Sequence, residues 1–263
     1  MDLKVIVLAA GQGKRMNSES EQLPKVLRRA CGRPLISYPL ALLEQLPRRD
    51  VIVVTGFMSE KVRDTLGPEY SYALQAEQKG TGHAVQCALP ALEGYSGPVL
   101  ILYGDMPLLR RETVDGLIRR YEESGAKAVL LSADIKEGPL PAFGRIVREN
   151  GTFSRIVEDR DCTPEQKKIT ELNVGVYLFD AECLRRALSE LRADNAQGEL
   201  YLTDVPEILK KAGHPVEVYA IDSLEESMGV NTPEDLAEVE RVLHARAEKG
   251  RMISRLFLTK GCS

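Results

Sequence analysis

The chain has 263 residues and a formal net charge of -4, from 35 Lys and Arg against 39 Asp and Glu. A net acidic chain with no Trp is a poor candidate for binding nucleic acid or a membrane surface, because such proteins present a basic or an aromatic face. Its five cysteines and three histidines are scattered along the chain, which argues against a disulfide framework and against a zinc site.

Short apolar runs alternate with amphipathic segments in the first half of the chain. The apolar runs predict buried strands at residues 3–10, 50–55, 72–75, 98–103 and 128–133. The amphipathic segments predict helices at residues 34–46, 58–66, 81–89 and 112–124. This alternation predicts an α/β fold, with a Rossmann-like, mostly parallel sheet and helices on both of its faces.

The alternation of predicted strands and helices changes after about residue 134. Two alternating runs, at residues 144–147 and 152–157, flank an Asn-Gly pair, which predicts a hairpin. Further strands are expected at residues 172–179 and 215–221, and helices at residues 181–191 and 202–212. Thr232 and Pro233 predict the N-cap and the first residue of a last helix. The second half therefore adds a small β-rich lobe to the same domain.

The first predicted strand ends in a glycine-rich turn, residues 8–13, which read LAAGQG. Glycines at the carboxyl end of a strand let the backbone approach a phosphate, which the free N–H groups of the turn can bind. The third glycine of a dinucleotide-binding turn and the Gly-Lys-Ser/Thr ending of a Walker loop are both missing. Lys14, Arg15 and Lys25 add positive charges that suit a polyphosphate, although a structural turn with solvated cations remains the alternative.

A second glycine-rich turn lies in residues 75–84, which read QAEQKGTGHA. The amide of Gln75 offers a donor and an acceptor together, as the imide edge of a base requires. The alternative for Thr81 is a helix N-cap without any ligand. We expect His83 to pack or to form hydrogen bonds rather than to catalyse.

Two oxygen-bearing side chains follow predicted elements at positions suited to a metal ion. Asp105 comes after the buried strand at residues 98–103, and Asn231 comes just before the last helix. Mg²⁺ prefers oxygen ligands and takes few from the protein where phosphates supply the rest. The pair is a candidate magnesium site, with simple helix capping as the alternative for each residue.

Taken together, these motifs resemble the uridyltransferase half of the bifunctional N-acetylglucosamine-1-phosphate uridyltransferase/glucosamine-1-phosphate acetyltransferase family. The matching stretches run in family order and are residues 8–16, 23–27, 75–84, 103–108, 143–146, 156–158, 172–175, 195–204 and 229–233. Residues 8–16 are typical of the broad sugar-nucleotidyltransferase superfamily, whereas residues 75–84 and the NAQGE run at 195–199 indicate this member.

The resemblance implies an Mg²⁺-dependent enzyme that converts UTP and N-acetylglucosamine 1-phosphate to UDP-N-acetylglucosamine and pyrophosphate by in-line attack on the α-phosphorus. For the nucleotide, it implies contacts at Leu8, Ala9, Ala10 and Gly11, phosphate neutralisation by Arg15 and Lys25, and uracil contacts at Gln75, Gly80 and Thr81. The implied Mg²⁺ ligands are Asp105 and Asn231. The implied sugar contacts are Gly144, Glu158 and Asn173, with Tyr103 and Gly104 lining the sugar site.

The same resemblance implies a nucleotide-diphospho-sugar transferase fold of the GT-A-like type. Residues 1–250 would form the nucleotidyltransferase domain, with a nucleotide-binding half at about 1–133 and a sugar-binding half at about 134–230, followed by a tail at 251–263. No hexapeptide-repeat β-helix is visible after about residue 250, so we expect neither acetyltransferase activity nor the family's trimer, but a monomer or weak dimer.

Two departures and two alternatives accompany the resemblance. Lys14 stands where the family usually has a small hydroxyl residue, and residues 17–22 lengthen the loop before Leu23. The same chemistry on another sugar 1-phosphate or NTP stays open, as does a non-catalytic nucleotide-sugar-binding regulatory protein. A glycosyltransferase is less favoured, because Asp105 does not belong to an Asp-x-Asp motif. We expect a cytoplasmic protein, since no apolar run spans a bilayer and no signal peptide is visible.

Overall fold

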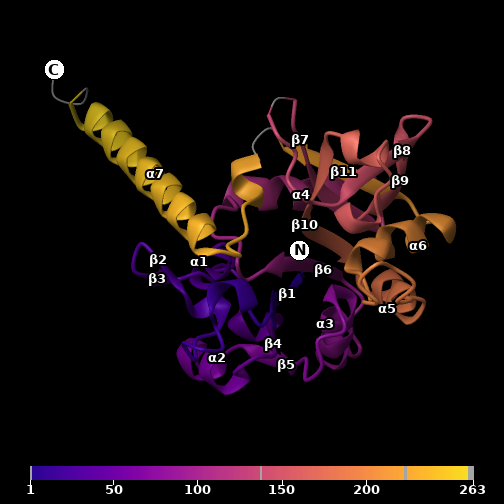
Figure 1. Ribbon diagram of the computed structural model, residues 1–263, viewed down its shortest axis with the longest axis horizontal. Helices are drawn as coiled ribbons and strands as arrows, with labels where there is room; N and C mark the ends of the chain where they lie inside the picture. The colour runs from indigo at the N-terminus through magenta and orange to yellow at the C-terminus, as the bar shows by residue number, and fades with distance from the viewer. Residues whose placement is uncertain (1, 137, 222–223, 260–263) are drawn as a thin grey trace.

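A computed structural model describes residues 2–136, 138–221 and 224–259 of the chain. These residues form a nine-stranded sheet flanked by helices, and a separate two-stranded ribbon (Figure 1). The strands are β1 (Lys4–Ala9), β2 (Arg29–Ala30), β3 (Arg33–Pro34), β4 (Val51–Thr55), β5 (Ser71–Leu74), β6 (Pro98–Tyr103), β7 (Ala128–Asp134), β8 (Arg145–Glu149), β9 (Thr152–Val157), β10 (Glu171–Asp180) and β11 (Val216–Ile221). The helices are α1 (Ser37–Ala41), α2 (Ser59–Leu66), α3 (Thr81–Ala88), α4 (Arg111–Ser124), α5 (Ala181–Ser189), α6 (Val205–Lys211) and α7 (Pro233–Thr259).

The main sheet has the strand order β11-β7-β10-β6-β1-β4-β5, and β8 and β9 join it through β10. β1 pairs in parallel with β4 and β6, β5 pairs in parallel with β4, and β11 pairs in parallel with β7. β10 is antiparallel to both β6 and β7. The sheet is therefore mostly parallel, as predicted, with β10 reversed in its middle.

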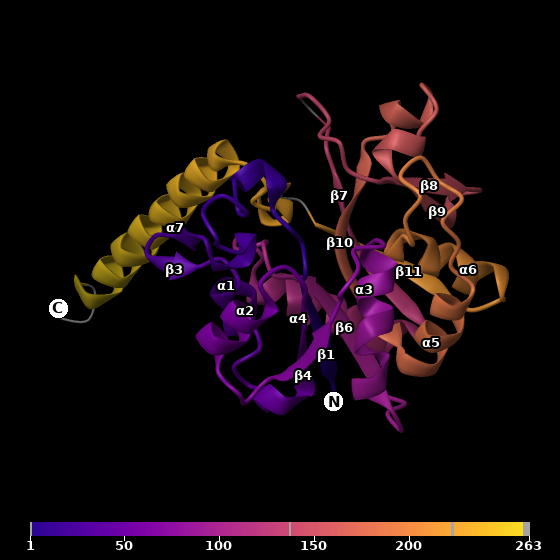
Figure 2. The ribbon, with the colours of Figure 1, turned by 60° about the horizontal axis from the view of Figure 1, so that its bottom comes forward.

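The central strands bury side chains on both faces of the sheet, which is why they read as continuous apolar runs. In β1, Val5 and Val7 belong to one apolar cluster and Ile6 and Leu8 to another, because successive side chains point to opposite faces. Helices α1, α2 and α4 cover the first cluster, and α3, α5 and α6 cover the second (Figure 2). The predicted layers of helices on both faces are confirmed.

The β-rich lobe consists of the hairpin β8–β9, which extends from β10. Asn150 and Gly151 form its turn with φ values of 51° and 79°, the left-handed conformation that tight hairpin turns require. β10 itself contains a bulge between Asn173 and Tyr177, where Gly175 has a φ of 89°. Such a bulge redirects the side chains beside it.

The helix predicted at residues 34–46 is much shorter in the structure, where α1 spans only Ser37–Ala41. Pro34 pairs with Arg29 in the two-stranded ribbon β2–β3. After α1 the chain continues in i to i+3 turns, with the N–H groups of Leu43 and Leu46 donating to the carbonyls of Leu40 and Leu43. Of the apolar positions that carry the predicted helical spacing, Leu35 is buried, whereas Tyr38, Leu42 and Leu46 are only partly buried.

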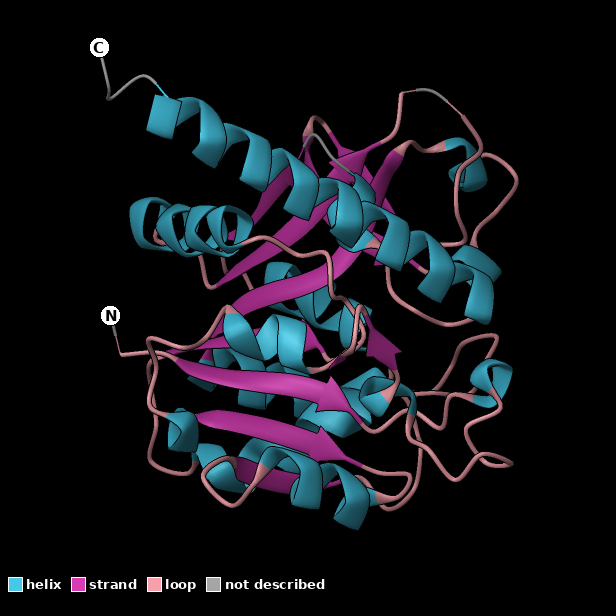
Figure 3. Cartoon of the chain, turned by 90° about the vertical axis from the view of Figure 1, so that its left-hand side faces the viewer, coloured by secondary structure: helices cyan, strands magenta, loops and turns pink. Residues whose placement is uncertain are grey.

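Helix α7 begins where the sequence predicts. Thr232 precedes it as N-cap, its hydroxyl accepting from the N–H of Asp235 at 3.1 Å, while the Asp235 carboxylate accepts from the N–H of Thr232 at 2.8 Å. Val239 and Val242 pack in a third apolar cluster against the β2–β3 region. The helix runs past residue 250, where the tail was expected to begin, and residues 260–263 of that tail lie outside the described residues (Figure 3). Among the described residues, no helix has the length and apolarity needed to cross a membrane.

Candidate active site

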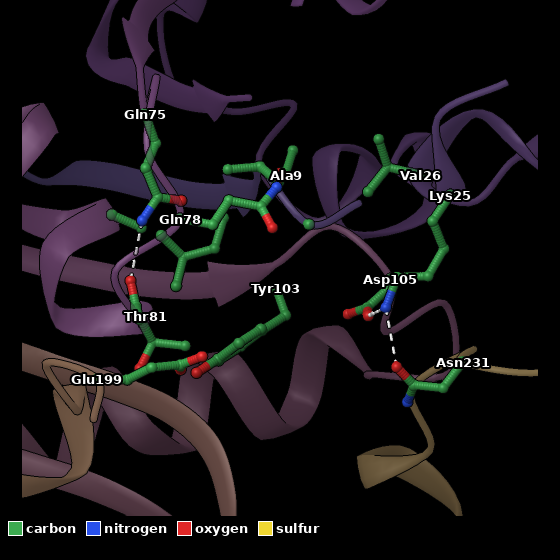
Figure 4. A pocket seen from close by; sticks show the side chains of 15 residues that line it. Ala9, Lys25, Val26, Gln75, Gln78, Thr81, Tyr103, Asp105, Glu199 and Asn231 are labelled. Carbon is green, nitrogen blue, oxygen red and sulfur yellow. Dashed lines mark hydrogen bonds and ion pairs between the residues drawn. The ribbon is translucent and has the colours of Figure 1, made fainter. Parts of the chain in front are cut away.

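A cavity of about 310 Å³ opens at the carboxyl ends of β1, β5 and β6 (Figure 4). Open parallel sheets bind ligands at this edge. Its lining comprises Leu8, Ala9, Ala10, Gly11, Lys25, Val26, Gln75, Gln78, Gly80, Thr81, Ala84, Tyr103, Asp105, Glu199 and Asn231. We call it the first pocket. It gathers both glycine-rich turns that the sequence singled out.

The first glycine-rich turn forms one wall of this pocket. Gln78 donates from its side-chain nitrogen to the carbonyl oxygen of Ala10 at 2.7 Å, which joins the two turns across the pocket. Gly11 is exposed at the mouth, and its Cβ position is open. Gly13 has a φ of 64°, and a Cβ there would lie 2.7 Å from Cβ of Lys25, so this turn needs glycine.

The second turn is tied to a segment far along the chain. The hydroxyl of Thr81 accepts from the N–H of Leu202 at 3.0 Å, and the N–H of Gly82 donates to the carbonyl of Leu200 at 2.8 Å. Gly80 is the N-cap of α3, with a φ of 104°, so Thr81 is the first helical residue rather than the cap. These contacts bring Glu199 to the pocket wall.

Gln75 lies at the back of the pocket with only 5% of its surface exposed. Its side-chain nitrogen donates to the carbonyl of Gly80 at 2.9 Å and lies 3.2 Å from Nδ1 of His83. In Figure 4 the amide nitrogen faces the second turn and the amide oxygen is turned toward Gln78. An acceptor inside the pocket is thereby held in a fixed orientation.

A second cavity of about 250 Å³ lies on the β-rich side of the first pocket. Its lining comprises Tyr103, Asp105, Met106, Ala142, Phe143, Gly144, Glu158, Asn173, Val174, Gly175, Ser227, Gly229 and Asn231. We call it the second pocket. Tyr103, Asp105 and Asn231 line both pockets, so the two cavities meet at these three residues.

The bulge in β10 and the start of β8 build the floor of the second pocket. The N–H of Asn173 donates to the carbonyl of Gly144 at 2.8 Å, and a Cβ on Gly144 would lie 2.9 Å from Ile156. The Asn173 amide donates to the hydroxyl of Tyr177 at 2.7 Å. The Asn173 side chain is therefore oriented by groups beneath the pocket.

Burial dominates the electrostatics of the second pocket. It raises the pKa of the Glu158 carboxyl, although a hydrogen bond from the Thr203 hydroxyl at 2.9 Å lowers it in part. Burial, with the charges of Glu158 and Asp105, raises the pKa of the Tyr103 phenol, which stays neutral between the two pockets. The pKa of Asp204 is raised to about 6, chiefly by burial and then by Glu207, Glu158 and Asp161.

A cluster of Lys25, Asp105 and Asn231 occupies the junction of the pockets. The Lys25 ammonium forms an ion pair with Asp105 and donates to the Asn231 amide oxygen at 2.9 Å. The Lys25 and Asp105 side chains are 12% and 15% exposed, respectively. A hydrogen bond of 2.9 Å from the N–H of Val230 to the Asp105 carbonyl holds the two segments together.

The oxygen atoms at this junction fit the predicted magnesium site. A carboxylate and an amide carbonyl both turn toward a single positive charge, here the Lys25 ammonium. Both are hard oxygen donors of the kind that Mg²⁺ takes. The amide nitrogen of Asn231 donates to the carbonyl of Gly229 at 3.3 Å, which leaves its oxygen on the side of Asp105.

Most of the residues implied by the resemblance lie together in these two cavities. Arg15 and Gly104 are not among the lining residues. Arg15 is exposed on the short 3-10 turn Lys14–Met16, and Gly104 is buried with its N–H donating to the carbonyl of Leu8 at 2.9 Å. Gln78 and Glu199 were not assigned a role from the sequence, although both fall inside the stretches that carry the resemblance.

Comparison with known proteins agrees with this architecture. The pattern of the MobA-like NTP transferase domain matches residues 5–244 of the chain. The chain belongs to this family. It is 43% identical over 248 residues to the bifunctional protein GlmU of Halalkalibacterium halodurans, a match covering 94% of this chain and 53% of that protein. It is 44% identical over 250 residues to the bifunctional protein GlmU of Clostridium perfringens, covering 95% and 54%, respectively.

This NTP transferase domain thus spans about half the length of the curated relatives it matches. A solved structure from Bacillus anthracis, described as a glucose-1-phosphate thymidylyltransferase in complex with sucrose, matches with a TM-score of 0.73 at 20% identity, over 92% of this chain and 95% of that chain. The resemblance inferred from the motifs and the predicted fold class are both confirmed. The roles of individual site residues stay predictions.

Proposed function

We propose that this chain is a Mg²⁺-dependent uridylyltransferase that joins UTP and N-acetylglucosamine 1-phosphate to give UDP-N-acetylglucosamine and pyrophosphate. The observation that carries the proposal is the meeting of two pockets at Tyr103, Asp105 and Asn231. A transfer between two bound substrates needs such a shared junction, because the reacting groups must be held in contact. The curated relatives, bifunctional GlmU proteins, support this choice of substrates.

The first pocket would hold the nucleotide. Its glycine-rich turn offers backbone N–H groups to the phosphates, and Gln75 offers an amide oxygen to the N3–H group of uracil. Gly80 and Thr81 line the same pocket and would contact the uracil as well. Arg15, exposed after this turn, would add charge to the phosphates, as proposed from the family resemblance. Lys14, also exposed, would add a further charge where the family usually has a small hydroxyl residue.

The second pocket would hold the sugar phosphate. Glu158 and Asn173 present a carboxylate and an amide that can bind sugar hydroxyl and N-acetyl groups, above a backbone held close by Gly144. Tyr103 lines both pockets as a neutral phenol. Because Tyr103 lines both pockets, it would help to orient the acceptor phosphate toward the nucleotide.

The chemical step then requires positioning and charge neutralisation. An oxygen of the sugar phosphate attacks the α-phosphorus in line, the bond from the α-phosphorus to the bridging oxygen breaks, and pyrophosphate departs. Lys25 places a positive charge at the junction for the phosphates. Held by Asp105 and Asn231, Mg²⁺ would supply further neutralisation of the reacting phosphates.

A pyrophosphate-release assay tests the proposal. The purified chain is incubated with each of four NTPs and a panel of hexose 1-phosphates, with Mg²⁺ or with excess chelator. We expect release only when UTP, N-acetylglucosamine 1-phosphate and Mg²⁺ are all present. Release with a different pair would favour the same chemistry on other substrates. Calorimetric binding of UDP-N-acetylglucosamine without any turnover would favour a regulatory binding protein instead.

We also propose an assembly state, a set of partners and a location. A monomer or weak dimer is the assembly state expected from the sequence, and sedimentation at several protein concentrations tests it. Small molecules are the proposed partners, with no nucleic acid or membrane among them, and the proposed location is the cytoplasm. Fractionation of cells that express the full natural protein tests the location.

A further inference from the structure

Three side chains behind the first pocket are linked by polar contacts. Of these three, only Gln75 has a role in the proposed function. Gln75 faces the pocket, His83 lies behind it on α3, and Cys87 follows one helical turn later. The side-chain nitrogen of Gln75 lies 3.2 Å from Nδ1 of His83, and Nε2 of His83 lies 3.8 Å from Sγ of Cys87. His83 therefore connects the side chain of Cys87 on α3 with the side chain of Gln75 in the pocket wall.

The identity of the amide atom next to His83 follows from a second contact. The same Gln75 nitrogen donates to the carbonyl of Gly80 at 2.9 Å. A peptide carbonyl can only accept, so this atom is the NH₂ group of Gln75. One of its two hydrogens points to Gly80, and the other is available to Nδ1 of His83. The oxygen of the amide must then face the pocket.

The tautomer of His83 follows in turn. Nδ1 can accept from the Gln75 NH₂ group only if it carries no hydrogen, so the ring proton resides on Nε2. Nε2–H then points toward Sγ of Cys87, a weak acceptor at a reasonable distance for sulfur. In this series of contacts, from Cys87 through His83 and Gln75 to Gly80, every donor faces an acceptor.

We propose that His83 is a positioning residue that fixes the amide of Gln75 with its oxygen facing the first pocket, and thereby selects a pyrimidine that carries N3–H. This inference rests on the proposed function, because it concerns the base of the nucleotide substrate. Uracil presents N3–H to the Gln75 oxygen, whereas cytosine presents an N3 lone pair to the same oxygen. Two acceptors facing each other leave a buried group unpaired, which disfavours CTP.

Substitutions of His83 test the proposal by base discrimination. His83→Leu removes the acceptor at Nδ1, while His83→Asn restores an oxygen near the same position. We expect the ratio of kcat/KM for UTP over CTP to fall about tenfold in His83→Leu, the factor that one ordinary hydrogen bond supplies. The change should appear in KM for UTP with little change in kcat. His83→Asn should recover most of the ratio.

Binding measurements separate this inference from the proposed function. Calorimetry gives the ratio of UTP to CTP affinity without any turnover, and ¹⁵N NMR of His83 identifies the protonated ring nitrogen. An absence of turnover in the unmodified chain would refute the uridylyltransferase proposal while the affinity ratio still tests His83. A proton on Nδ1, equal binding of UTP and CTP, or an unchanged ratio in His83→Leu would overturn the inference.

His214 offers a matched control on the turn before β11, where its N–H donates to the carbonyl of Leu209. His214→Leu makes the same change of side chain outside both pockets and should leave the UTP to CTP ratio unchanged. Thermal melting of each variant checks that the fold is retained. A loss of discrimination in His83→Asn equal to that in His83→Leu, with both variants folded, would mean that the acceptor is irrelevant.

Discussion

The carboxylate of Asp105 carries the negative charge at the junction of the two pockets, where it contacts Lys25 and lies beside Asn231. Asp105→Asn keeps the shape of the side chain but removes that charge. We expect turnover to fall by about 100-fold or more, because a metal ion held at reacting phosphates contributes several kcal/mol to the transition state. Pyrophosphate release measures turnover, and titration with Mn²⁺ measures metal binding.

The backbone around this residue should survive the change. The Asp105 carbonyl would still accept from the N–H of Val230, so the loop geometry does not depend on the charge. Asp134→Asn removes the same charge from an exposed position at the end of β7 and should leave both measurements unchanged. Normal turnover and normal Mn²⁺ affinity in Asp105→Asn would contradict the assigned role.

Asp204 gives a prediction about pH. Its pKa is raised to about 6 in the folded chain, whereas an unfolded Asp titrates near 3.9, so between these values only the folded state retains the proton. Stability is therefore lost as the pH rises from about 4 to about 6. Asp204→Asn cannot ionise, so it should stabilise the chain above pH 6 and change little near pH 4.

The size of this effect is limited by solvent, because the Asp204 side chain is only partly buried. We expect about 1 kcal/mol above pH 6, or an increase in Tm of about 2–4 °C. Differential scanning calorimetry at pH 4, 6 and 8 measures it. Asp194→Asn, at an exposed position, controls for net charge. An equal shift in Tm at all three pH values would show that ionisation is not the cause.

The sequence predicted the positions of some pocket residues but not of others. Asp105 and Asn231 could be placed at the pocket because each lies two residues from the end or the start of a regular element at the ligand-binding edge. Glu199 could not be placed, because it is brought to the first pocket by hydrogen bonds between segments far apart in the sequence, such as that between Thr81 and Leu202, which are 121 positions apart. Arg15 is exposed and lines neither pocket, and sequence alone does not specify the direction of a long surface side chain.

At the scale of elements, the start of α3 depends on Gly80. Its φ is 104°, and an added Cβ would lie 2.5 Å from the carbonyl oxygen of Leu200. Gly80→Ala should therefore destabilise the chain by about 1–3 kcal/mol, since both the backbone conformation and the contact with Leu200 resist a side chain. The displaced helix start should also raise KM for UTP, because Gly80 and Thr81 line the first pocket.

Gly213 separates these two causes. It has a φ of 82°, but an added Cβ would meet no atom within 4 Å. Gly213→Ala therefore carries only the backbone cost of about 1 kcal/mol and should leave KM for UTP unchanged. Urea denaturation and the pyrophosphate assay measure the two quantities. Equal destabilisation in both variants would show that the contact with Leu200 contributes nothing.

The sequence predicted which segments are strands more reliably than how they pair. Residues 172–179 were expected as a strand, and β10 confirms it, but its reversed direction between β6 and β7 was not predicted. A strand buried on both faces is apolar throughout in either direction, so its side chains carry no signal of orientation. The short ribbon β2–β3 was missed because two-residue strands have no periodicity to read.

The reversed strand has a consequence for the whole molecule. The family resemblance predicts a nucleotide-binding half before about residue 134 and a sugar-binding half after it, and β10 comes from the second half. It lies between β6 and β7 of the first half, and it also carries Asn173 of the second pocket. Each half therefore completes the sheet and the core of the other, and the two pockets are fixed relative to one another.

We accordingly expect the halves to unfold together. Removing β10 would leave β6 and β7 without their shared neighbour and expose apolar side chains on both faces of the sheet. Calorimetry of the chain should show a single transition, with a calorimetric enthalpy equal to the van't Hoff enthalpy. A fragment ending at residue 133 should lack cooperative unfolding. Two resolved transitions, or a fragment that melts cooperatively, would mean that the halves are independent and that the shared sheet does not couple the pockets.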